Sequence, residues 1–175
     1  PGRSAAFGAT ACSPCADGAV APNVSTAFCE VCAQGEFASA NRTQCIPCPD
    51  GSVSGAGSLA CSTCPRGTWA KERAACVGCT PGRYGATEGL SAPACTGNCS
   101  AGFYSLNFAQ TCAACDPGRF SNRPGADFCS YCPESMTSGT NASACVASVG
   151  WVVGRIVDAE EGALLHKCPT GAMCD

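Results

Sequence analysis

A large or β-branched side chain recurs at one position of each repeat along this 175-residue chain, with polar and turn-forming residues in between. These side chains recur every 15 to 20 residues, so they form neither the stripe of an amphipathic helix nor the alternation of a long strand. Because most are aromatic or β-branched, each is expected to begin a short extended segment. The recurring residues are Val20, Phe37, Val53, Trp69, Tyr84, Tyr104, Phe120 and Thr137.

Turn signals surround each of these positions. A glycine stands two residues earlier in seven of the eight units, often after a proline, and Ser135 takes its place in the eighth. Glycine permits the positive φ of a tight turn, and proline fixes φ ahead of it. A second cluster of Gly, Ser and Asn then reverses the chain. The pattern predicts a series of small two-stranded loops.

Cysteine pairs mark the ends of these loops. Seven of the eight pairs are C-x-x-C, and Cys95/Cys99 has one extra residue. The pairs are Cys12/Cys15, Cys29/Cys32, Cys45/Cys48, Cys61/Cys64, Cys76/Cys79, Cys95/Cys99, Cys112/Cys115 and Cys129/Cys132, and Cys145, Cys168 and Cys174 follow.

Composition indicates what replaces a hydrophobic core. Cysteine supplies 19 residues, whereas Leu, Ile, Val and Phe together make up only about 14% of the chain. The net charge is only −3, so disulfides are a better explanation than disorder. Disulfides persist outside the cytosol, which predicts an extracellular protein. The acidic balance gives no basic face for nucleic acid, and no apolar run reaches the length of a membrane helix.

The sequence does not fix the disulfide connectivity, but the simplest scheme joins the second Cys of each pair to the first Cys of the next. Each such loop stabilises the fold by about 3 kcal/mol in the chain-entropy model. The expected bonds are Cys15–Cys29, Cys32–Cys45, Cys48–Cys61, Cys64–Cys76, Cys79–Cys95, Cys99–Cys112, Cys115–Cys129 and Cys132–Cys145, with Cys168–Cys174 by elimination.

Cys12 is left over by this scheme. The opening Pro1-Gly2-Arg3 matches residues 81–83 and 117–119, where a Cys lies two positions before the Pro. We therefore expect residues 1–12 to be the end of a repeat that begins upstream, and Cys12 to pair with the missing Cys. One free thiol is the alternative.

The motif C-P-x-G-x-aromatic-S followed by C-x-x-C resembles the ephrin-receptor-like cysteine-rich repeat, a relative of the tumour-necrosis-factor-receptor repeat. The resemblance is clearest in residues 64–69 and 115–121 and covers residues 1 to about 145. It implies a small disulfide-rich fold, an elongated array of short β-ribbons with eight tandem repeats over 12–145. Such arrays occur in receptor ectodomains and in large surface proteins of algae and protists, including the hair-like mastigonemes of flagella.

The pattern fails after Cys145, so residues 146–175 are expected to form a hairpin-like junction to a following module. Residues 151–157 are predicted to be a strand. Residues 163–167 are expected to pair back with them as a second strand or to form a short helix.

Four N-x-S/T sequons are candidate glycosylation sites: Asn23, Asn41, Asn98 and Asn141. Asn23, Asn41 and Asn141 fall in predicted turns, whereas Asn98 lies beside a cysteine that is expected to be disulfide-bonded. Chance occurrence in a Ser- and Thr-rich chain is the alternative. We expect N-linked glycans on at least two of the four.

Repeated C-x-x-C also raises the possibility of zinc binding, but the loops are shorter than the usual zinc spacing and continue without a break. No cofactor or metal is expected. No catalytic set can be built around His166, the single histidine, so the chain is not expected to be an enzyme. The recurring aromatics are expected to cover the disulfides as a minimal core, with a ligand-binding ladder as the alternative.

The expected function is structural: a rod or fibre segment of an extracellular glycoprotein, such as a flagellar or cell-surface filament. Its partners would be other copies or modules of the same protein. A receptor ectodomain that binds a protein ligand along the repeat face is the alternative.

Overall fold

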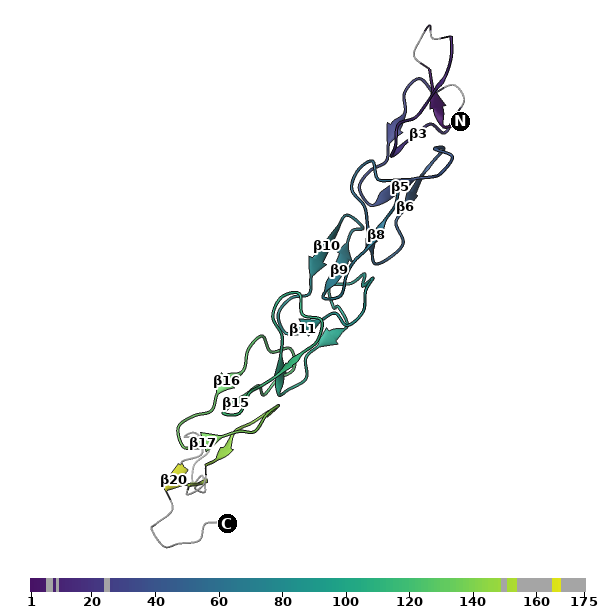
Figure 1. Ribbon diagram of the computed structural model, residues 1–175. Helices are drawn as coiled ribbons and strands as arrows, with labels where there is room; N and C mark the ends of the chain where they lie inside the picture. Colours follow the sequence, from purple (N-terminus) through teal and green to yellow (C-terminus); the bar gives the residue numbers. More distant parts are fainter. Residues whose placement is uncertain (6–7, 9, 24–25, 149–150, 154–164, 168–175) are drawn as a thin grey trace.

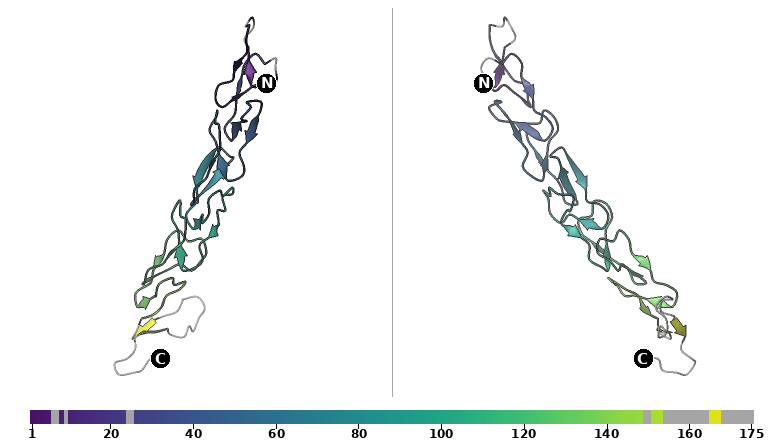
Figure 2. Two further views of the ribbon diagram at one scale, coloured as in Figure 1. Left: turned by 45° about the vertical axis from the view of Figure 1, so that its right-hand side comes forward. Right: turned by 180° about the vertical axis from the view of Figure 1, so that it is seen from behind.

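The described residues of this computed structural model are 1–5, 8, 10–23, 26–148, 151–153 and 165–167. They form an elongated rod in which two-stranded antiparallel hairpins follow one another in sequence order (Figure 1, Figure 2). The predicted fold class, a small disulfide-rich array, is confirmed. The described part of the chain contains no helix, and hence no helix that could cross a membrane.

Ten hairpins make up the described structure. They pair β1 (Arg3–Ser4) with β2 (Ser13–Pro14), β3 (Ala19–Val20) with β4 (Glu30–Val31), β5 (Glu36–Ala38) with β6 (Cys45–Pro47), β7 (Ser52–Val53) with β8 (Ser62–Thr63), β9 (Thr68–Lys71) with β10 (Ala75–Gly78), β11 (Arg83–Tyr84) with β12 (Gly97–Asn98), β13 (Phe103–Tyr104) with β14 (Ala113–Ala114), β15 (Arg119–Phe120) with β16 (Ser130–Tyr131), β17 (Met136–Thr137) with β18 (Val146–Ala147), and β19 (Trp151–Val153) with β20 (Leu165–Lys167).

Eight disulfides close eight of these hairpins, with the local pairing of the simplest scheme. The bonds are Cys15–Cys29, Cys32–Cys45, Cys48–Cys61, Cys64–Cys76, Cys79–Cys95, Cys99–Cys112, Cys115–Cys129 and Cys132–Cys145, and we number the loops that they close repeats 1 to 8. Their Cα–Cα distances of 5.5 to 6.0 Å lie within the normal range for disulfides. Cys168 and Cys174 lie outside the described residues.

The interior of the rod consists of sulfur and small side chains. The Cys that opens each of repeats 1 to 7 is at most 1% exposed. The residue six positions after the opening Cys is also buried in every repeat, and we call this the small-residue position. It holds Ala21, Ala38, Ser54, Ala70, Gly85, Ser105, Ser121 and Ser138.

The expectation that aromatic side chains form the core is wrong in most repeats. Val20 is buried beside the Cys32–Cys45 disulfide of the next repeat. The aromatics at the same position in later repeats are only half-buried, and Thr137 is exposed. Stacked repeats approach each other too closely for a large ring to enter, so the disulfide and the small residue fill the space.

Two arrangements were predicted after residue 151, a hairpin or a strand followed by a short helix. The structure has the hairpin, in which β19 pairs with β20. In it, Trp151 pairs with Lys167 and Val152 with His166. Of the predicted strand over 151–157, residues 151–153 are described as a strand and 154–157 lie outside the described residues.

Candidate functional site

For a chain of stacked hairpins, the candidate site is the joint between neighbouring repeats. We call the residue three positions after the opening Cys the repeat glycine; it is Gly in repeats 1 to 7 and Ser135 in repeat 8. At five of the seven joints its N–H donates to the carbonyl of the small-residue position of the following repeat. The five bonds are Gly35 to Ser54, Gly67 to Gly85, Gly82 to Ser105, Gly102 to Ser121 and Gly118 to Ser138, at 2.9 to 3.0 Å.

A second backbone bond crosses all seven joints. We call the segment that links the two strands of a hairpin the far turn. The N–H of the small-residue position donates to a carbonyl in the far turn of the next repeat, as from Ala70 to Leu90 at 2.7 Å and from Gly85 to Ala109 at 2.9 Å. The equivalent bond runs from Ser54 to Arg73 at 3.0 Å. Because this residue both accepts and donates, its backbone connects three successive repeats.

A third bond returns from the far turn to the preceding repeat. Gly57 donates to the carbonyl of Cys32 and Gly89 to that of Cys64, both at 2.8 Å. Burial of the opening cysteines would otherwise leave these carbonyls without a partner, which is costly. The joint is therefore made mainly of backbone hydrogen bonds and depends little on side-chain identity.

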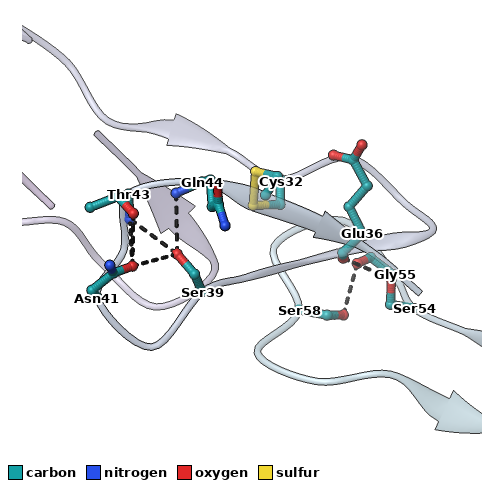
Figure 3. Close-up of a disulfide and its surroundings, with 10 residues drawn as sticks. Cys32, Glu36, Ser39, Asn41, Thr43, Gln44, Ser54, Gly55 and Ser58 are labelled. Carbon is teal, nitrogen blue, oxygen red and sulfur yellow. Dashed lines mark hydrogen bonds between the residues drawn. A yellow bond between two sulfur atoms is a disulfide. The ribbon is translucent and has the colours of Figure 1, made fainter. Parts of the chain in front are cut away.

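Buried serines add a side-chain bond at four joints. The hydroxyl at the small-residue position donates to the carbonyl of the residue after the preceding repeat glycine. The bonds run from Ser54 to Glu36, Ser105 to Arg83, Ser121 to Phe103 and Ser138 to Arg119, at 2.7 to 3.1 Å. The first is drawn in Figure 3. The sequence motif contained this serine, but no role was predicted for it.

Contacts also reach the second neighbour along the rod. A Cβ at Gly67 would lie 2.2 Å from the carbonyl oxygen of Phe108 in repeat 6, and a Cβ at Gly82 would lie 2.1 Å from that of Gly125 in repeat 7. Both glycines also have positive φ, at 79° and 81°. These positions therefore require glycine for two reasons, the turn and the stacking, of which the sequence indicated only the first.

Two ion pairs occupy equivalent places on the surface. Asp17 pairs with Arg42 at 2.8 Å and Asp50 with Arg73 at 2.9 Å, each between neighbouring repeats. Their side chains are substantially exposed, so each pair contributes little to stability.

All four sequon asparagines are exposed. Asn41 has the most ordered surroundings (Figure 3): its Oδ1 accepts from the hydroxyls of Ser39 and Thr43, both at 2.8 Å. Its amide nitrogen has no hydrogen-bond partner among the described residues. Asn141 has a φ of 52°, and its backbone N–H donates to Cys115 across a joint, which leaves the side chain at the surface. Ser25, the acceptor residue of the Asn23 sequon, is outside the described residues.

Cys12 is exposed and forms no disulfide in the structure. It lies beside β2, which pairs with β1 in the register of the other repeats. The expected bond to an upstream cysteine stays a prediction. Sixteen other cysteines are oxidised and offer no thiolate, and within the described ranges no cluster of His, Cys, Asp and Glu is arranged to hold a metal ion.

No protein-family model matches this chain, and no curated protein matches it. The structure establishes a tandem series of disulfide-bonded β-hairpin repeats. The resemblance to ephrin-receptor-like repeats stays a prediction.

Proposed function

We propose that this chain is a structural segment of a long extracellular glycoprotein, in which it acts as a rod or fibre element without enzymatic activity. The observation that carries the proposal is the joint: each repeat is joined to the next by backbone hydrogen bonds that recur along the rod, and glycines such as Gly67 and Gly82 lie close to the backbone of the second neighbour. Eight disulfides favour a secreted or cell-surface setting. The partners would be other copies or modules of the same protein, and N-linked glycans would cover a surface with few charges.

Local disulfides suit a rod that bears tension. With each disulfide intact, the covalent path through one repeat is a Cα–Cα span of about 5.6 Å plus the short segment between the cysteines of a pair. The fully stretched path is therefore about 16 Å per repeat, compared with about 55 Å for a reduced repeat of the same length. The oxidised rod has little hidden length to release under load.

Force spectroscopy of the full chain, attached next to Cys15 and next to Cys145 so that only the eight disulfide-closed repeats bear the load, tests this mechanical role. We expect no lengthening step above about 15 Å in the oxidised protein and steps of about 40 Å after reduction. Long steps before reduction would overturn the proposal, because a loop would then be open to the applied force.

The setting is tested on the source cells. The resemblance favours a surface filament, such as the hair-like filaments of flagella. Immunogold labelling with an antibody against the chain should decorate extracellular filaments at regular spacing. Labelling inside the cell would contradict the proposal, and uniform labelling of the cell membrane would favour a receptor.

The receptor alternative is supported by one region of the surface. Phe128 is 60% exposed and Tyr131 is 72% exposed, and the guanidinium of Arg119 lies 3.9 Å from the centre of the Tyr131 ring. Exposed aromatics and arginine are frequent anchors of protein interfaces. If this region binds a ligand, Tyr131→Ala should abolish labelling of cells by the soluble chain, whereas Phe28→Ala at the other end of the rod should not.

A further inference from the structure

Asn98 differs from the other sequon asparagines in its surroundings. It is the last residue of β12, immediately before the buried Cys99, and it belongs to the cysteine pair with the extra residue. Its side chain is exposed, and Ser100 completes the sequon. The carboxamide therefore lies on the outer face of the joint between repeats 5 and 6.

A cavity of about 300 Å³ opens at this place. It is lined by Tyr84, Asn98, Ser100, Phe103, Thr111 and Cys112. The two aromatic residues are half-buried and come from different repeats, and the two hydroxyl residues are exposed. The volume is at the lower end of the range of about 300 to 1,000 Å³ for small-molecule sites, which suits one or two sugar rings.

Repeat 7 lies on another side of the Asn98 carboxamide. Gly125 of repeat 7 faces Asn98, and a Cβ at Gly125 would lie 3.8 Å from the amide nitrogen. This is an ordinary van der Waals distance, so glycine at this position leaves a gap of about one methyl group beside the carboxamide.

We propose that Asn98 carries an N-linked glycan whose first N-acetylglucosamine lies in this cavity and bridges repeats 5 and 6. The inference rests on the proposal that the chain is a glycoprotein. It adds which asparagine carries a glycan and which residues the first sugar contacts. In the transfer step, the amide nitrogen of Asn98 bonds to C1 of a lipid-diphosphate-linked oligosaccharide and loses one proton. The bond from C1 to the diphosphate oxygen breaks, and the lipid diphosphate leaves with that electron pair.

The chemistry of the cavity matches this sugar. One face of the pyranose ring is made of C–H groups, which pack well on the rings of Tyr84 and Phe103. The N-acetyl and hydroxyl groups pair with the hydroxyls of Ser100 and Thr111. A free sugar would bind so open a cavity weakly, but covalent attachment raises its effective concentration into the millimolar range or above.

Occupancy is tested first. The chain is secreted from a eukaryotic host and treated with a peptide N-glycosidase in ¹⁸O-water, and each released site is identified by mass spectrometry as an ¹⁸O-labelled aspartate. We expect the label at Asn98 and its loss in Ser100→Ala. An unlabelled Asn98 beside labelled Asn41 would overturn this inference and leave the glycoprotein proposal intact. The absence of label at all four sequons would overturn both.

Contact is tested on protein whose glycans are trimmed to one N-acetylglucosamine. We expect Asn98→Gln to lower the Tm by about 2 to 4 °C relative to the trimmed parent chain. In a Tyr84→Ala/Phe103→Ala background the same substitution should change the Tm by less than about 1 °C, because both stacking rings are gone. Asn41→Gln is the matched control and should have no such effect in either background.

A spectroscopic readout completes the test. A nuclear Overhauser effect between the N-acetyl methyl group and the ring protons of Tyr84 or Phe103 would support the contact. If that effect is absent and Asn98→Gln has equal consequences in both backgrounds, the sugar projects into solvent and the proposed contact is wrong.

Discussion

Repeats 4 and 5 differ more than any other neighbours, yet they make the same joint. Repeat 4 has the shortest loop, with a sequence separation of 12 between its cysteines and four-residue strands. Repeat 5 has the longest, with a sequence separation of 16, two-residue strands and an extra residue after Cys95. Each nevertheless shares three backbone hydrogen bonds with the repeat that follows.

The comparison separates the constrained part of a repeat from the free part. Three inward positions stay constant: the opening Cys, the repeat glycine and the small residue. The far turn changes, since repeat 4 uses Glu72 and Arg73 at positive φ and repeat 5 uses Gly89. The extra residue of repeat 5 is accommodated where Cys95 adopts a φ of 54°, so the register of Asn98 with Arg83 is kept. Extra residues in a repeat are therefore tolerated where they do not change the hydrogen bonds of the joint.

Removal of each disulfide gives the largest expected effect. Replacing both cysteines by Ala in repeat 4 or in repeat 5 should lower the free energy of unfolding by about 3 kcal/mol, and the two losses should differ by only about 0.3 kcal/mol, because loop entropy grows slowly with length. Urea unfolding in a Trp151→Phe background, with Trp69 as the probe, measures both. A difference of several kcal/mol would show that the two loops are not equivalent.

The repeat glycine should come next. Gly67→Ala and Gly118→Ala impose the same strain, since both residues have a φ of 79°. A Cβ at Gly67 meets the backbone of repeat 6, whereas no described atom lies within 4 Å of one at Gly118. We expect a loss of about 1 kcal/mol at Gly118 and about 2 kcal/mol more at Gly67. Equal losses in urea unfolding would show that only the turn requires glycine.

The buried serine of the joint between repeats 5 and 6 should have a smaller effect. Ser105 is 2% exposed, and its hydroxyl donates to the carbonyl of Arg83 at 2.8 Å. Ser105→Ala should cost about 1 kcal/mol through this lost bond. Ala70 already has a methyl group at the same position in repeat 4, so Ala70→Ser is the reverse variant. Faster amide exchange confined to repeats 5 and 6 in Ser105→Ala would locate the effect, and unchanged exchange would contradict it.

The far turns should give the smallest effects, with opposite signs. Glu72 has a φ of 53° and is exposed, so Glu72→Gly should raise the free energy of unfolding by about 0.5 kcal/mol. Gly89 has a φ of 71°, so Gly89→Ala should lower it by about 1 kcal/mol. Calorimetric Tm values of both variants check the signs. Two shifts of the same sign would mean that the turns matter through contacts rather than through backbone conformation.

The sequence by itself determined everything that depends on neighbours along the chain. The spacing of the cysteines predicted all eight described disulfides, because the bonded cysteines are separated by only 12 to 16 positions in the sequence. Gly and Pro predicted the turns, because their backbone preferences are local. The prediction of short strands followed from the isolated apolar residues for the same reason.

Only the tertiary structure decided what fills the space between repeats. The contacts of Gly67 with Phe108 and of Ser105 with Arg83 join residues that are 41 and 22 positions apart. No local preference of the chain encodes the close stacking that these contacts reflect. Aromatic side chains were therefore expected in the interior, whereas the structure has sulfur and small side chains there. The cavity beside Asn98 arises in the same way, since its two rings come from different repeats. Local chemistry forms each hairpin, and the backbone bonds between hairpins determine which side chains are buried and which are left at the surface.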